Sequence, residues 1–258
     1  MMRAKRTVMN AWRTAAMTLV ALSALSAASA QNLVRDPSFE TTISTNNYGN
    51  PPTTWFVNQS FGSDANGDTN GTSQVWVVTS GSIDLVNGPN FGHPNGGGDQ
   101  FVELNGNNPG AIRQTVTVSQ DGLYDFSFFY GGYAATESGG TPASNYELRA
   151  RARIVDSGGG VVHSADVAWS IDAAGGVNGS WIDTPYTAQF VLFAGTYYVE
   201  FESLHFGGLD SNGNTIPNYF GPRIDSVNLS LVPEPASMVA LGAGLTGLLG
   251  LRRRRARG

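Results

Sequence analysis

Residues 31–231 predict an all-β fold, a two-sheet sandwich of the jelly-roll type, and three observations lead to this class. Short runs of valine, isoleucine and aromatic residues are separated by clusters of glycine, asparagine, serine and threonine. Several runs alternate apolar and polar residues, with the period of two that half-buried strands have. No amphipathic helical pattern occurs in this part of the chain. Many short strands joined by polar loops favour two packed sheets.

Nine runs are expected to be strands. The run 123–130 places Tyr124, Phe126 and Phe128 on one face, and the run 146–155 alternates aliphatic or small residues with charged ones. In chain order, the expected strands are 74–79, 100–104, 111–118, 123–130, 146–155, 161–171, 186–193, 196–203 and 223–231.

The first thirty residues have the features of a secretory signal peptide. Residues 1–13 carry four basic side chains and no acidic one, and residues 14–27 are apolar and small. A small-x-small cleavage site follows at 28–30. We therefore expect a signal helix that signal peptidase removes before Gln31. The alternative is a retained anchor helix. The apolar part is short and ends in small residues, which favours a cleaved signal peptide over an anchor.

The last 27 residues, 232–258, form a three-part tail. Pro233, Glu234 and Pro235 come first, and the prolines favour an extended linker. Residues 236–251 carry no charge, and at about sixteen residues they are just short of the usual length of a membrane helix. The arginine-rich cluster 252–257 would stay on the cytoplasmic side. The alternative, a buried C-terminal helix of the domain, is disfavoured because arginine clusters rarely fit a core.

This tail resembles the PEP-CTERM sorting signal in the order and spacing of its three parts. The resemblance implies a transient inner-membrane intermediate, cleavage near the Pro-Glu-Pro motif by an exosortase, and delivery to the surface or extracellular matrix of a Gram-negative bacterium. It covers only the tail, and it gives the destination of the protein without giving its activity.

The charge of the mature part excludes one class of partner. Residues 31–231 contain six arginines, no lysine and nineteen acidic residues, a net charge of −13. A strongly acidic surface repels phosphate backbones, so nucleic acid is not an expected partner. The chain has no cysteine, so an exported domain of this kind must be held by its core, with or without a metal ion.

Five short motifs follow one another along residues 31–231. They are Asp36-Pro37-Ser38-Phe39-Glu40, the stretch 98–106, the stretch 110–115, the stretch 122–128 and the stretch 221–229. In this order they resemble the DUF642 group and its relatives among the galactose-binding-like β-sandwiches. The resemblance implies a jelly roll that often binds carbohydrate and frequently holds a structural calcium ion.

Two acidic residues are the main candidates for holding such an ion. Strict alternation places Asp225 on the apolar face of the last strand, where a carboxylate must be paired, hydrogen-bonded or bound to a metal. Glu40 ends the first motif, with Arg35 as its only basic neighbour in sequence. First and last strands commonly lie side by side in such sandwiches, so the two carboxylates could meet. The alternative is that Asp225 pairs with Arg223 or Arg35, or caps a turn.

Further oxygen ligands come from residues near these two. The carbonyl of Ser38 is one, and Glu103 and Asp99 are weaker candidates for the same calcium site. The loop 64–71 also alternates oxygen-bearing side chains, but it departs from the EF-hand pattern, and a polar loop without a metal is the favoured interpretation.

Carbohydrate binding would use aromatic platforms and hydrogen-bonding side chains. Trp55 is a candidate platform, although most tryptophans of a sandwich lie in its core or at its rim. Arg149, Arg151 and Arg153 hold half of the positive charge of the mature part and could receive an acidic polysaccharide. The alternative is a solvated, charged strand face.

Signals of catalysis are weak. The three histidines show no metal-ligand spacing and are expected in loops or on strand surfaces, and no nucleophile motif occurs. We therefore expect an exported, non-catalytic protein that binds polysaccharide in an extracellular matrix or biofilm, or contributes to that matrix. The alternatives are a structural or adhesive protein without a defined ligand and, less favoured, a secreted glycoside-active enzyme.

Overall fold

The computed structural model describes residues 31–40, 53–57, 60–61, 75–87, 98–133, 146–170, 181–209, 215–216 and 220–233. The chain divides into two compact units, Asn32–Leu231 and a unit made of Met1–Gln31 with Val232–Gly258. Within the described residues all regular structure is β-strand, and they include no helix long and apolar enough to cross a membrane. The predicted signal helix and membrane helix lie outside them.

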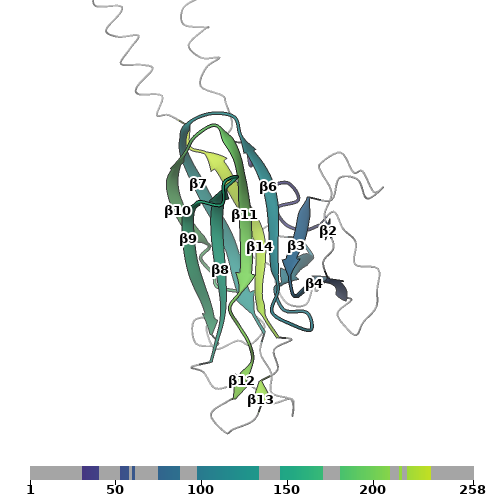
Figure 1. The fold of residues 1–258 in the computed structure, drawn as a ribbon. Helices are drawn as coiled ribbons and strands as arrows, with labels where there is room; N and C mark the ends of the chain where they lie inside the picture. The colour runs from purple at the N-terminus through teal and green to yellow at the C-terminus, as the bar shows by residue number, and fades with distance from the viewer. Residues whose placement is uncertain are drawn as a thin grey trace, which may run out of the picture. The chain divides into compact units, whose positions relative to one another are not determined.

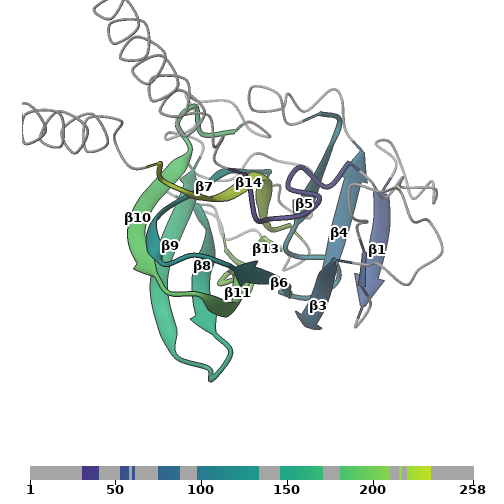
Figure 2. The same cartoon turned by 90° about the horizontal axis from the view of Figure 1, so that it is seen from above.

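Two six-stranded antiparallel sheets form the unit Asn32–Leu231 (Figures 1 and 2). Sheet A contains, from edge to edge, β1 (Thr53–Val57), β4 (Ser82–Asn87), β5 (Gln100–Glu103), β14 (Pro222–Leu231), β7 (Gly122–Gly132) and β10 (Tyr186–Leu192). Sheet B contains β2 (Ser60–Phe61), β3 (Trp76–Ser80), β6 (Ala111–Val118), β11 (Gly195–Ser203), β8 (Glu147–Asp156) and β9 (Val161–Ser170). The short strands β12 (Gly208–Leu209) and β13 (Thr215–Ile216) pair with each other.

The chain passes back and forth between the sheets, as expected of a jelly roll. From β5 onward the strands lie in sheets A, B and A, then β8 and β9 form a hairpin in B, and β10, β11 and β14 lie in A, B and A. This arrangement confirms the predicted all-β sandwich. All nine expected strands are present within a few residues of their expected ends, whereas β1, β2, β4, β12 and β13 were not expected as strands.

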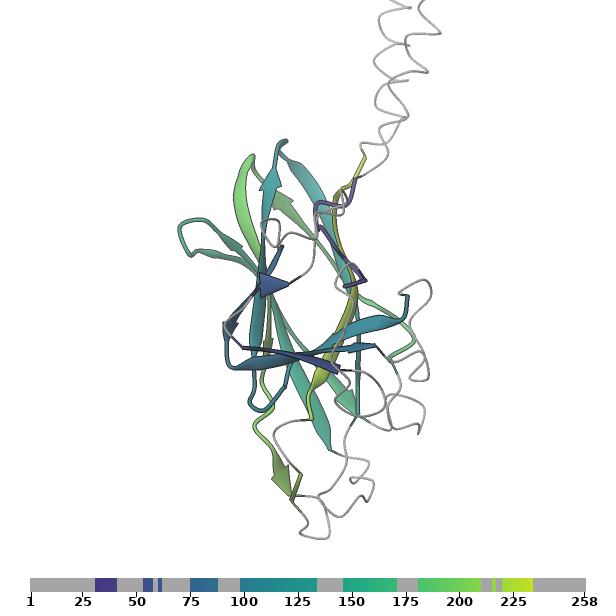
Figure 3. The ribbon, with the colours of Figure 1, turned by 90° about the vertical axis from the view of Figure 1, so that its right-hand side faces the viewer.

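The two sheets face each other (Figure 3). Side chains from both fill the space between them. Phe128 of β7 packs edge-on against Phe201 of β11, with ring centroids 5.0 Å apart. The predicted alternation is visible in β7 and β11, where every second residue is buried. A contiguous apolar core of this size can hold a domain that has no disulfide.

The N-terminal segment lies along β14 and turns against β3. Leu33 N donates to the Leu229 carbonyl (2.8 Å), and Val227 N donates to the Pro37 carbonyl (2.8 Å). Asn32 therefore lies beside Ser230, close to the C-terminal end of β14. Both ends of the domain leave it at the same place.

A β-bulge in β14 changes the face on which its residues lie. Asp225 pairs with Phe129 of β7, but Asn228 pairs with Ser127, so β14 contains one extra residue between the two pairs. Ser226 adopts a left-handed conformation there, with φ of 51°. The expectation that Asp225 shares the core face with Val227 is therefore wrong. Asp225 is fully buried, but on the opposite face of the sheet.

Candidate functional site

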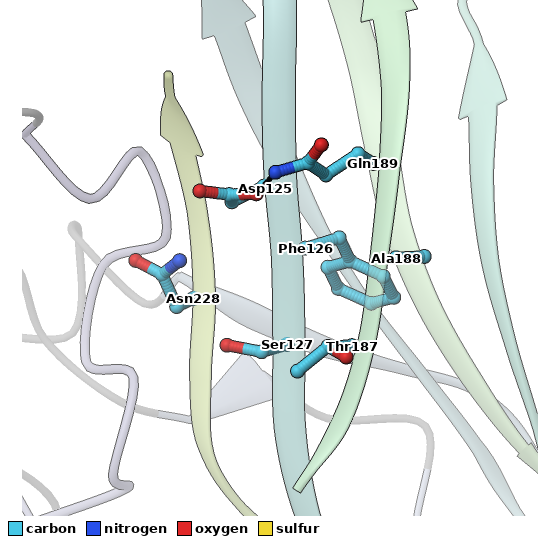
Figure 4. Close-up of a pocket in the computed structure, with 7 residues that line it drawn as sticks. All are labelled: Asp125, Phe126, Ser127, Thr187, Ala188, Gln189 and Asn228. Atoms are coloured by element: carbon cyan, nitrogen blue, oxygen red, sulfur yellow. Dashed lines mark hydrogen bonds between the residues drawn. The ribbon is translucent and has the colours of Figure 1, made fainter. Parts of the chain in front are cut away.

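A shallow groove lies on the outer face of sheet A, across β14, β7 and β10 (Figure 4). Its volume is about 460 Å³. Strand register places its polar side chains in two rows, because antiparallel partners point to the same face. One row is Asn228, Ser127 and Thr187, and the other is Asp125 and Gln189, with the buried Ser230 in register beside Asp125.

Hydrogen bonds within the groove fix its two rows. Gln189 Nε2 donates to Asp125 Oδ1 at 2.6 Å, as drawn in Figure 4, and Asn228 Nδ2 donates to Ser230 Oγ at 3.2 Å. The amides and hydroxyls supply both donors and acceptors, and the carboxylate of Asp125 supplies a strong acceptor. Such a set matches the hydroxyl groups of a polyol, which both donate and accept.

Apolar side chains border the groove at both ends. On the side toward the end of β14, Leu123 and Val191 are strand partners and are exposed. On the other side, the half-buried Phe129 follows Ser127 on the same face of β7. A sugar ring has apolar C–H faces as well as hydroxyls, so polar rows between apolar borders suit it. None of these residues was predicted, because each looks in sequence like an ordinary surface position of a strand.

Beyond the bulge, the outer face of sheet A is closed by a second, smaller cluster. Phe101 and Trp181 meet edge to face with centroids 5.4 Å apart, and Val86 and Phe129 pack with them. A row of strand partners also crosses this part of the sheet: Trp55 of β1, Asp84 of β4, Glu103 of β5 and Arg223 of β14. Nothing further is described of the Trp55 side chain, so its predicted role as a sugar platform stays a prediction.

Glu103 is held by Arg223. Arg223 Nε donates to Glu103 Oε2 at 3.1 Å, and Gly221 N donates to Glu103 Oε1 at 3.1 Å. The guanidinium lies over the rings of Phe101 and Tyr133, at 4.7 and 5.7 Å from their centroids. Burial raises the pKa of Glu103, while Arg223 and the Gly221 amide oppose this rise. The structure thus gives Glu103 an ion-pair role that the sequence analysis did not assign to it.

The predicted calcium ligands Glu40 and Asp225 approach the same part of β5. Gln100 N donates to Glu40 Oε1 at 2.6 Å, and Gln100 Nε2 donates to the Phe39 carbonyl at 3.2 Å. Asp225 follows Ile224, the β14 partner of Val102 in β5, and its Oδ1 accepts from Ser226 N at 2.6 Å. Ser38 lies in the turn before Phe39.

The backbone around these acids is strained. Asp36, Phe39 and Ser226 all have positive φ values, of 45°, 59° and 51°. Such conformations cost about 1–3 kcal/mol each and concentrate at binding sites.

Two carboxylates with nearby carbonyls are the donor type that calcium prefers, so the residues fit the ion in kind. Among the described residues, no group of three or more histidine, aspartate or glutamate side chains is placed to share a metal, so carbonyls or water would have to complete the shell. The weaker candidate Asp99 is exposed beside Gln100, and the loop 64–71 lies outside the described residues.

The three arginines of β8 do line one face, the outer face of sheet B, but acids pair with each. Arg151 Nε and Nη2 bond to Asp166 at 2.7 and 3.0 Å. Arg149 Nε bonds to Glu147 at 2.9 Å, and Arg153 lies 3.2 and 3.4 Å from Glu200 and Glu202. Four acids thus pair with the three arginines, so this face carries no net positive charge, and the geometry favours the solvated, charged face over an anion site.

Other aromatic and histidine candidates serve packing. Trp76, Trp169 and Trp181 are buried, so none is an exposed platform. His205 is buried too and lies 2.6 Å from the Tyr146 hydroxyl, which corrects the expectation of a surface position. His163 stacks on Phe190 with centroids 4.9 Å apart, and burial lowers its pKa.

Asp84 gives the domain a predicted pH dependence. Burial, followed by the charge of Glu103, raises the pKa of Asp84 from 3.8 to about 7. The folded state therefore binds this proton more tightly than the unfolded state, and stability falls as pH rises from about 4 to about 7. The full shift corresponds to about 4 kcal/mol, and partial contact of Asp84 with water reduces this to roughly 2 kcal/mol.

We expect Asp84→Asn to raise the free energy of unfolding at pH 8 by roughly 2 kcal/mol and to change it little at pH 5, because only the ionised form is penalised. Urea unfolding at the two pH values measures this difference. The exposed Asp183→Asn serves as the matched control. An equal gain at both pH values would show that the pKa of Asp84 is ordinary.

Comparison with known proteins supports the analysis of the tail. Residues 231–255 match the model of the PEP-CTERM protein-sorting motif. The chain thus carries this motif where the sequence predicted it, and the motif indicates export and sorting to the cell envelope or surface. The chain matches no curated protein.

Solved structures that are similar to the chain include carbohydrate-binding modules. One is TmCBM61 in complex with β-1,4-galactotriose, at 14% identity and a TM-score of 0.38, covering 77% of this chain and 97% of that one. Two others are family 35 modules. That of Clostridium thermocellum has 15% identity, a TM-score of 0.37 and coverage of 61% and 92%. That of Paenibacillus barcinonensis has 12% identity, a TM-score of 0.36 and coverage of 61% and 93%. At TM-scores below 0.5, these similarities say nothing about what this chain binds, and its architecture is established by its own strand pairing.

Proposed function

We propose that the protein binds polysaccharide at the cell surface without catalysing a reaction, through the groove on the outer face of sheet A. The observation that carries this proposal is the pair of polar rows, Asn228–Ser127–Thr187 and Asp125–Gln189, bordered by apolar side chains. One row runs across three strands and the other across two, so the donors and acceptors are held by a rigid sheet rather than by loops. A preorganised polar surface of this kind loses little entropy when a sugar binds.

The charges favour a neutral sugar. Asp125 is the only ionisable side chain among those that line the groove, and it would repel an acidic polysaccharide. The arginines that could have received such a ligand lie on sheet B and are ion-paired. The proposed ligand is therefore a neutral polysaccharide of the surrounding matrix or biofilm.

A single carboxylate in the groove also argues against glycoside hydrolysis, which uses a pair of them. Within the part of the chain that the structure describes, Asp84 and Glu103 are the one pair of carboxyls in register, and they would suit the alternative of a glycoside-active enzyme. Glu103 is buried and bound to Arg223, so it is poorly placed to attack or protonate a substrate. Sugar release from bound polysaccharide, abolished by Asp84→Asn, would favour the enzyme.

The groove predicts a specific pattern of binding losses. Asp125→Ala and Gln189→Ala should each weaken binding of a neutral polysaccharide at least about fivefold, because each removes a hydrogen-bonding group worth about 1–3 kcal/mol. Affinity electrophoresis against a panel of neutral and acidic polysaccharides measures the effect. Both changes are at the surface, so thermal stability should barely move.

The matched control for the groove is the triple variant Arg149→Gln, Arg151→Gln, Arg153→Gln on the opposite sheet. It should bind neutral polysaccharide as the wild type does. Loss of binding in this triple variant, with full binding in the two groove variants, would move the binding face to sheet B and contradict the proposal.

We also propose that a structural calcium ion sits between Glu40 and Asp225, with the Ser38 carbonyl as a further ligand. Bound calcium stabilises the folded state by mass action, by about 2.7 kcal/mol at one hundred times its Kd. The melting temperature should rise with calcium and fall with a chelator. Glu40→Gln and Asp225→Ala should each remove this response, whereas the exposed Asp183→Ala should keep it. A wild type freed of metal and indifferent to calcium would rule out the site.

The sorting tail predicts the composition of the released protein. We propose that signal peptidase removes 1–30 and that an exosortase cleaves near Pro233–Pro235, so the intact mass of released protein should lack both segments. A variant with Pro233, Glu234 and Pro235 all changed to alanine should stay in the membrane fraction at the mass of the uncleaved tail. Released wild-type protein that still contains Arg252–Arg255 would exclude this processing.

A further inference from the structure

Three exposed apolar side chains lie at the end of the domain where β14 ends. They are Leu123, Val191 and Phe193, exposed by 40%, 54% and 64%, and we call them the terminal apolar patch. Leu123 and Val191 are strand partners, and Leu192 pairs with Gly122, the first residue of β7. Leu231, the last residue of β14, pairs with Tyr124 in the same part of sheet A. The patch therefore lies at the end of the sheet from which the sorting tail continues.

Phe193 is presented by a fixed backbone. Its N–H donates to the Tyr197 hydroxyl at 3.3 Å, and that hydroxyl donates back to the Phe193 carbonyl at 3.0 Å. The next N–H, of Ala194, donates to Asp121 Oδ1 at 2.7 Å. Exposed apolar surface on this immobilised turn costs free energy in water, and an apolar partner that covers the patch would recover it.

The short link between β14 and the uncharged segment of the tail indicates a partner, the membrane surface. Only residues 232–235 separate β14 from the uncharged segment 236–251, and four residues reach at most about 14 Å. The headgroup layer on each side of a bilayer is about 5–8 Å thick. When 236–251 lies in the membrane, the end of β14 is therefore within several ångströms of the lipid surface.

We propose that the terminal apolar patch docks on the bilayer interface while the protein is still anchored by its tail. This inference rests on the tail being membrane-embedded before cleavage and not on polysaccharide binding, although two members of the patch, Leu123 and Val191, also border the groove. The β6–β7 turn at 119–121 and the β10–β11 turn at 193–194 contain none of the six arginines of the mature part. Asp121 adds a negative charge in the first of these turns. The surface that fits is therefore a zwitterionic lipid interface, entered by the aromatic and aliphatic side chains.

The absence of cysteine from the chain permits a site-specific test. Phe193→Cys is labelled with an environment-sensitive fluorophore, and the full chain is reconstituted in phosphatidylcholine vesicles and recovered by flotation. Phe206→Cys is the matched control, because Phe206 is also exposed, at 76%, but follows the other end of β11. The nine residues of β11 separate the two positions by about 30 Å.

We expect a blue-shifted emission at position 193, quenched by brominated lipid, and a water-like emission at position 206. Leu123→Cys should give an intermediate shift, since Leu123 is the less exposed member of the patch. A water-like emission at 193 in floated protein, or equal shifts at 193 and 206, would overturn the proposal. The groove variants Asp125→Ala and Gln189→Ala should leave the shift at 193 unchanged.

Discussion

The extra residue in β14 is the constraint on which the arrangement of sheet A depends. Before the bulge, Arg223 and Asp225 point to the outer face, and after it Val227 and Leu229 point to the core. A strand without the bulge would send one of these pairs to the wrong side. Ser226 takes a strained backbone conformation to permit the change, and the hydrogen bond from Val227 to Pro37 holds the N-terminal segment at the same point. The bulge thus joins the first and last parts of the domain.

The same bulge divides the outer face of sheet A into two regions with different physical characters. On one side, Arg223 and Glu103 form a buried ion pair under aromatic rings, a costly arrangement that is retained only when geometry satisfies both charges. On the other side, the polar rows around Asp125 stay open to water. The closed region makes one half of the sheet rigid, and we infer that this rigidity is what allows the open half to present its side chains in fixed rows.

The sequence predicted the sandwich because alternation reports burial directly, and strands such as β6 and β11 alternate without interruption. It failed for Asp225 because a bulge shifts the alternation by one residue, and a serine in a left-handed conformation has no distinctive sequence signal. The groove was also missed, since its side chains come from three strands that register alone brings together. Arg149, Arg151 and Arg153 do share one face of β8, as the alternation predicted. The sequence could not show their neutralisation, because the acids that pair with Arg151 and Arg153 lie on the neighbouring strands β9 and β11.

The central claim is that a neutral polysaccharide binds on the outer face of sheet A between the bulge and the end of β14. A crystal structure of the domain 31–231 soaked with an oligosaccharide from the polysaccharide it binds tests this claim most directly. The account predicts sugar density over β14, β7 and β10, with hydroxyl groups within hydrogen-bonding distance of Asp125 and Gln189 and a ring face against Leu123 or Phe129. Density over the arginine face of sheet B, or at the loops with the groove filled only by water, would contradict it.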